Sequence, residues 1–246
     1  MNGKKAFTLI ELLVVIATIA LLLGILLPSL GRARDQGKYV VCQAHIKGLG
    51  LAITMYADDN DGYTYNPRND GRWQDLGFGS NYTGKWLKAT DPLAYWGIAY
   101  APYAKNRKVF HCTATQRVDD WWHVEDQEIY KYCSYGLNGY ACNDFGEREH
   151  VRLCDFKRPA EFILAQDHIE QLLDDNAGGD MFYIPEDQSI NLAQWRFGSL
   201  SQEYPYAVEE CFRHFGKSNT LWLDGHVSPI KETTGEDIPA AWYKGH

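Results

Sequence analysis

The sequence predicts an α+β protein, in which a long N-terminal helix, apolar all round in its first half, packs against a small antiparallel sheet. Residues 12–27 contain no charged side chain. Asp224-Gly225 separates two short runs of strand-forming residues, which indicates a β-hairpin. Between them lies a stripe of apolar residues at spacings of four and three, typical of an amphipathic helix: Cys42, Ile46, Leu49, Ile53 and Tyr56.

The N-terminal apolar segment is long enough to cross a membrane. From Phe7 to Leu27 its only ionisable side chain is Glu11. About 20 residues at a rise of 1.5 Å each span a hydrocarbon core of ~30 Å. A carboxylate within such a core costs a few kcal/mol, so we expect it to have a use. No small-x-small cleavage site follows, which favours a membrane anchor over a secretory signal peptide.

After Pro28 the helix is expected to resume and to carry the apolar stripe as far as Ala57. The result is one bent helix about 75 Å long. Gly48 and Gly50 weaken its second half by about 1 kcal/mol each relative to alanine. The acidic turn 58–62 ends it. We therefore divide the chain into four parts: a leader 1–6, a transmembrane helix 7–28, its amphipathic continuation 29–57 and a globular head 58–246.

The head is expected to contain a small sheet built from short strands. Pro229 cannot donate a ladder hydrogen bond, so it marks the last of these strands as an edge. Packing this sheet on the apolar stripe of the helix gives a single α+β head. The predicted strands are Lys108–Thr113, Phe162–Asp167, Thr220–Leu223 and His226–Ile230.

Composition limits the partners and the compartment. The net charge is −8, and an acidic head lacks the basic surface that phosphate contacts need, so we expect no nucleic-acid partner. The 6 cysteines fit an oxidising compartment, and none forms a Cys-x-x-Cys pair. Cys133 and Cys142 flank a turn-rich loop and are the candidate disulfide. Reduced, buried thiols are the alternative.

We expect neither a cofactor nor an enzymatic activity, because no nucleophile-elbow, zincin or Walker motif is present. Calcium at the turn 58–62 is an alternative, but the turn does not follow the EF-hand register. Zinc is a second alternative, which requires five residues to meet at one end of the sheet. Otherwise Asp224 belongs to a turn and His214 is structural. The five residues are Asp167, His168, His214, Asp224 and His226.

Residues 4–16, Lys-Lys-Ala-Phe-Thr-Leu-Ile-Glu-Leu-Leu-Val-Val-Ile, resemble the processing and methylation motif of type IV prepilins and type II secretion pseudopilins. The resemblance implies cleavage between Ala6 and Phe7, and N-methylation of Phe7. Glu11 and Pro28 then fall where the family has its glutamate and often a helix-bending proline. Ala6 departs from the glycine that usually precedes the cut.

The segment from His214 to Gly225 is similar to the His-x9-Asp-Gly segment near the C-terminus of a large group of prepilin-like proteins. This resemblance implies no established chemistry for the histidine or the aspartate. His45 and Thr113 depart from the asparagine and proline usual in the group. Three further segments resemble its other landmarks: 42–62, 110–112 and 134–138.

The resemblance implies a structural filament subunit, a pilin or pseudopilin, that crosses the bacterial inner membrane once. Its N-terminus would lie in the cytoplasm, with the head in the periplasm or displayed on the cell surface as part of the filament. The implied partners are a prepilin peptidase and methyltransferase, other pilin or pseudopilin subunits, an inner-membrane assembly platform and the lipid bilayer. Glu11 would pair with the Phe7 amine of a neighbouring subunit, because a buried charge pair is tolerated better than a lone charge.

The alternative function is a membrane-anchored extracytoplasmic binding module that uses a pilin-like anchor. Loops 73–100 and 121–140 are rich in Trp and Tyr, whose faces could stack on carbohydrate. Packing within the head is the other explanation for these aromatic residues.

Overall fold

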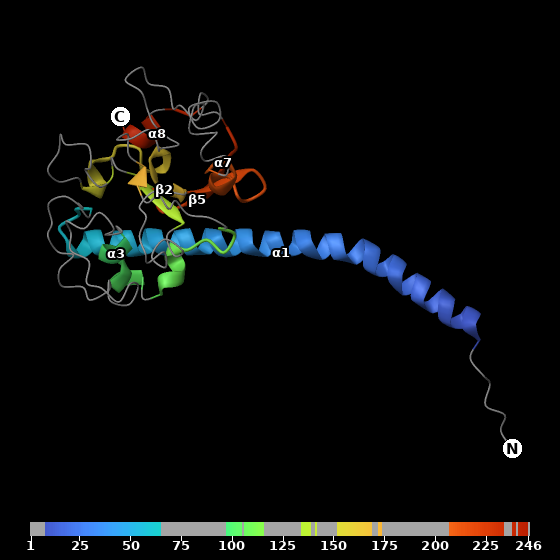
Figure 1. Cartoon of the computed structure of the whole chain (residues 1–246). Helices are drawn as coiled ribbons and strands as arrows, with labels where there is room; N and C mark the ends of the chain where they lie inside the picture. The colour runs from blue at the N-terminus through green and yellow to red at the C-terminus, as the bar shows by residue number, and fades with distance from the viewer. Residues whose placement is uncertain are drawn as a thin grey trace, which may run out of the picture.

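A single long helix organises the molecule. The computed structural model describes residues 8–64, 97–104, 106–115, 134–138, 141, 152–168, 172–173, 207–233, 238–239 and 241–245. Helix α1 (Leu9–Asp59) is 51 residues long. Its C-terminal half lies along the head, whereas its N-terminal half projects away from it (Figure 1). The two halves of the same helix therefore have different surroundings.

Local contacts explain where α1 begins and why it bends. Thr8 caps the helix through its hydroxyl, and Glu11 returns the contact to the Thr8 backbone, which completes a capping box. Pro28 lies inside the helix and removes one backbone hydrogen bond without ending it. The helix bends in its N-terminal half (Figure 1), as expected of a proline-containing helix. The expected continuous bent helix is confirmed.

The predicted apolar stripe is also confirmed. All five of its side chains are buried, and Tyr56, the most exposed, retains only 6%. The stripe packs against α3 (Gly97–Ala104), the short 3-10 helix η2 (Arg107–Phe110) and the sheet. The Tyr56 ring meets that of Tyr100 edge to face at 5.1 Å. Burial of this stripe holds the head on the helix.

The sheet has the strand order β3–β1–β2–β4–β5. Three successive pairs are antiparallel: β1 with β2, β2 with β4 and β4 with β5. The short β3 adds a parallel pairing to β1. The antiparallel α+β architecture predicted from the sequence is therefore confirmed, with β3 as an addition. The strands are β1 (Tyr135–Asn138), β2 (Ile163–Asp167), β3 (Leu172–Leu173), β4 (Lys217–Trp222) and β5 (Val227–Lys231).

The C-terminal hairpin and its edge strand follow the prediction. Strands β4 and β5 are joined at Asp224-Gly225, and β5 ends the sheet with Pro229 opposite Asn219. The predicted strand Lys108–Thr113 is wrong, because its first residues form η2. The Asn106 side chain accepts a hydrogen bond from the Lys108 N–H at 3.0 Å, which starts the turn.

Short helical segments complete the described part of the head. These are η4 (Leu153–Asp155), η5 (Pro159–Glu161), α7 (Ala207–Cys211) and α8 (Ala241–Lys244). Helix α7 leads through Arg213 and His214 into β4, and so brings two polar side chains to the end of the sheet that faces α1.

Candidate functional site

The first functional feature is the exposed apolar half of α1. Between Leu9 and Leu30, every large aliphatic side chain that is exposed retains between 46% and 87% of its surface. By length and composition this helix could cross a membrane. Such a surface is stable only against lipid or against other apolar helices.

Glu11 has a local partner within its own chain. Its Oε2 accepts from both the N–H and the hydroxyl of Thr8, each at 2.8 Å. In return the Glu11 N–H donates to the Thr8 hydroxyl at 3.2 Å. A role in capping therefore accompanies the expected role in assembly.

Ala6 and Phe7, which would flank the predicted cleavage, lie outside the described residues.

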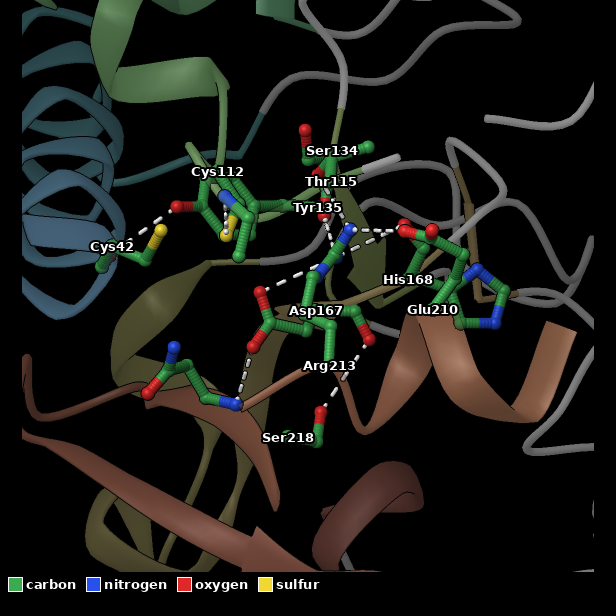
Figure 2. Close-up of polar contacts among 12 residues, drawn as sticks. Cys42, Cys112, Thr115, Ser134, Tyr135, Asp167, His168, Glu210, Arg213 and Ser218 are labelled. Carbon is green, nitrogen blue, oxygen red and sulfur yellow. Dashed lines mark hydrogen bonds and ion pairs between the residues drawn. The ribbon is translucent and has the colours of Figure 1, made fainter. Parts of the chain in front are cut away.

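The second feature is a buried polar junction between α1, the sheet and the segment after η2. It is formed by Cys42, Cys112, Asp167, Arg213 and His214, of which Figure 2 labels the first four. Arg213 is its cation. Its Nη2 lies 3.3 Å from Asp167 Oδ1, and its Nη1 lies 3.3 Å from Glu210 Oε2. Its Nη2 also donates to the Ser134 carbonyl at 2.6 Å. A buried guanidinium of this kind requires several partners, which the junction supplies.

The other half of the buried polar junction contains two thiols and an imidazole. Cys112 Sγ lies 3.1 Å from His214 Nε2. The same nitrogen lies 3.7 Å from Asp167 Oδ2. The candidate ligand atoms of Cys42, Cys112 and His214 all lie within 4.8 Å of one another. Thiolate sulfur and imidazole nitrogen are the usual ligands of zinc and similar ions. At these distances the three residues could hold a metal.

Backbone amides reach both sulfurs. The Thr113 N–H donates to Cys42 Sγ at 3.2 Å, and the Ala114 N–H donates to Cys112 Sγ at 3.4 Å. The tight turn after η2 presents these N–H groups. Cys42, Cys112, Cys154 and Cys211 form no disulfide in the structure.

Burial and neighbouring charges shift the pKa values of the buried polar junction in opposite directions. The hydrogen bond from Cys112 lowers the pKa of Cys42, whereas burial raises the pKa of Cys112. Burial also raises the pKa of Asp167, although Arg213 opposes it. Burial acts to lower the pKa of Arg213, but Asp167 outweighs it and raises that pKa, so the guanidinium stays charged.

The five residues considered for zinc do not meet at one place. His214 precedes β4 and Asp224 follows it, so a strand of 6 residues, roughly 20 Å, separates them. Asp167 lies beside His214, and the carbonyl of His168 accepts from Arg213 Nη2 at 3.4 Å. Asp224 instead pairs with His226 at the β4–β5 turn, at 2.6 Å.

Sequence reasoning missed the two cysteines of the buried polar junction. It placed Cys42 on the apolar stripe and Cys112 in a predicted strand, and found no link between them. A signal was present, because both cysteines belong to the landmark segments 42–62 and 110–112. The candidate disulfide partners Cys133 and Cys142 lie outside the described residues. So do the aromatic loops, except for residues 97–100 and 134–138.

Comparison with known proteins agrees with the N-terminal motif. Residues 1–27 match the family model of the prokaryotic N-terminal methylation motif. The chain is 44% identical over 66 residues to the type IV wide pilus major component PilA4 of Thermus thermophilus, which covers 27% of this chain and 50% of that protein. It is 35% identical over 60 residues to the type II secretion system core protein G of Pseudomonas aeruginosa, covering 24% and 42%.

A third relative is the ComG operon protein 3 homolog of Bacillus licheniformis, 38% identical over 64 residues, which cover 26% of this chain and 66% of that protein. The chain spans about half the length of the curated relatives it matches. No solved structure matches it.

The chain combines an apolar N-terminal helix, long enough to cross a membrane, with a small α+β head. Together with the methylation motif and the three relatives, this architecture shows that this chain is a prepilin-like protein. Among the described residues, α1 is the one helix long and apolar enough to cross a membrane, and together with the motif it indicates a single-pass anchor. Pilins and pseudopilins are structural subunits and not enzymes.

Proposed function

We propose that the chain is a structural subunit of a type IV pilus-like or type II secretion filament. The observation that carries the proposal is the exposed apolar half of α1, which no part of the described head covers. In the membrane, lipid covers this surface. In a filament, the corresponding helices of neighbouring subunits cover this apolar surface in place of lipid. Transfer from lipid to filament therefore exchanges one apolar environment for another.

The proposal includes processing and orientation. A prepilin peptidase cuts between Ala6 and Phe7, and methylation of the new amine follows. The N-terminus lies in the cytoplasm and the acidic head outside. Lys4 and Lys5 favour this orientation, whereas residues 32–38 carry basic side chains on the other flank. The methylation motif supports the cytoplasmic leader, because the motif is an N-terminal processing signal.

Glu11 is proposed to pair with the Phe7 amine of a neighbour during assembly. Because Glu11 also caps α1, its two roles need separate variants. Glu11→Gln preserves the capping box, since glutamine serves at this position, but removes the charge. Thr8→Val removes the capping hydroxyl and keeps the charge. If charge pairing drives assembly, Glu11→Gln inserts into the membrane but forms few filaments, and Thr8→Val assembles. Wild-type filament yield from Glu11→Gln would contradict the pairing.

Intact-mass and N-terminal peptide analysis of the protein from native membranes tests the processing step. The expected chain begins at N-methylated Phe7. Replacing Ala6 with Phe is expected to leave uncut precursor, because a bulky residue replaces the small one before the cut. A native chain that begins at Met1 would overturn the proposed pathway and leave a plain membrane anchor.

A further inference from the structure

We propose that Cys42, Cys112 and His214 form a structural site for a thiophilic divalent cation, with zinc as the fitting ion. The three side chains come from three separate places in the chain: α1, the turn after η2 and the segment before β4. Figure 2 shows the sulfur atoms of Cys42 and Cys112 facing each other across the buried polar junction, near Asp167.

The distances between the donor atoms are close to those in a tetrahedral zinc site. With Zn–S near 2.3 Å and Zn–N near 2.0 Å, ligand atoms in such a site lie about 3.5–3.8 Å apart. The Cys112 sulfur and His214 Nε2 are 3.1 Å apart, and the three donor atoms all lie within 4.8 Å. Asp167 Oδ2 lies 3.7 Å from the same nitrogen, but it accepts a hydrogen bond from the Asn219 N–H at 2.7 Å, so this carboxylate borders the site and is not one of its ligands. The three donors are therefore close enough to one another to bind one ion.

Backbone hydrogen bonds around the two sulfurs suit metal-bound thiolates. Backbone N–H groups of Thr113 and Ala114 donate to the two sulfur atoms at 3.2 and 3.4 Å. Such donors stabilise the negative charge of metal-bound thiolates, as outer-shell hydrogen bonds do in zinc sites. A disulfide between the same cysteines carries no charge, so it would give these amides and the facing imidazole little to bind.

Charge and burial are consistent with a closed, structural site. Binding a divalent cation to the two thiols releases two protons, so the net charge of the buried polar junction does not change. The exposed fractions of Cys42, Cys112 and Asp167 are 0%, and that of His214 is 2%. Because its ligands are buried, the ion would not be reached by a substrate from solution. It would fasten α1 to the sheet and to the turn after η2.

The test uses the full chain, purified in detergent from membranes, with zinc measured by elemental analysis and cobalt used as a spectroscopic replacement. We expect about one zinc per chain. After chelation, cobalt should restore thiolate charge-transfer absorption and the visible bands of a tetrahedral site. His214→Gln and Cys42→Ser should lose both signals. Cys154→Ser, at an exposed cysteine outside the site, is the matched control and should keep them.

A further variant, His214→Cys, distinguishes misfolding from loss of a ligand. It keeps a zinc-binding donor at the position, so it should bind metal where His214→Gln does not. Added zinc should raise the unfolding midpoint of the stripped wild-type chain and of His214→Cys, but not of His214→Gln. Two results would overturn the proposal. One is native protein whose peptides show a Cys42–Cys112 disulfide, and the other is metal content that none of these substitutions changes.

Discussion

Gly50 of α1 lies directly against Leu221 of β4. A Cβ atom placed on Gly50 would come within 2.8 Å of Leu221 Cδ1, closer than real contacts allow. Leu221 is fully buried, so its side chain has little room to turn away. The glycine that weakens the helix locally is therefore what lets the helix approach the sheet.

This contact predicts opposite results for two glycines of the same helix. Gly37 has nothing within 4 Å of a built Cβ, so Gly37→Ala should stabilise the protein by about 0.5–1 kcal/mol through helix propensity. Gly50→Ala gains the same propensity but overpacks Leu221, a penalty of about 1–3 kcal/mol, so a net loss is expected. Chemical unfolding of the full chain measures both. Equal stabilisation by the two substitutions would contradict the close approach.

The buried ion pair of Arg213 and Asp167 predicts a large loss when one partner is removed. The exposed fractions of their side chains are 4% and 0%. Arg213→Met leaves the carboxylate buried without its cation, which should lower the free energy of unfolding by about 3–5 kcal/mol. The matched control is Arg158→Met, which breaks the exposed pair with Glu161 and should change stability by less than about 1 kcal/mol. Similar losses from both variants would refute this account of the pair.

Sequence reasoning succeeded where nearby residues determine the structure. The spacing of Cys42, Ile46 and Leu49 requires only the period of a helix, and Asp224-Gly225 requires only the geometry of a short β-turn. The capping box of Thr8 and Glu11 is equally local, although it was not predicted from the sequence. The helical stripe and the turn could be predicted because each depends on a few neighbouring positions.

The buried polar junction could not be predicted in this way. Cys42, Cys112 and His214 are separated by long stretches of chain, and their meeting depends on how η2 and α7 enter the head. A strand was expected where η2 forms, which would have placed Cys112 differently. Local pattern does not contain this information, because the position of a loop is decided by tertiary packing rather than by propensity.

The Asp224-Gly225 turn predicts a backbone effect at the second residue. Gly225 has φ +85° and nothing within 4 Å of a built Cβ. Gly225→Ala is therefore strained by its backbone conformation alone, and should lower the free energy of unfolding by about 1–2 kcal/mol. Gly225→Asn should lose less, because asparagine adopts positive φ more readily. Thermal unfolding of the two variants provides the test, and a greater loss from asparagine would contradict it.

The Asp224 carboxylate predicts a component of acid sensitivity. Although partial burial opposes it, hydrogen bonds from the N–H and the ring of His226 lower the pKa of Asp224. An acid whose pKa is lower in the native state stabilises that state above the unfolded pKa, about 4, and loses this contribution as pH falls through the native value. The pair is partly exposed, so its contribution is at most about 1 kcal/mol. Asp224→Asn should therefore lower stability at pH 6 but match the wild type at pH 2, as measured by unfolding across this range. An equal difference at both pH values would assign the effect of the substitution to turn geometry instead of charge.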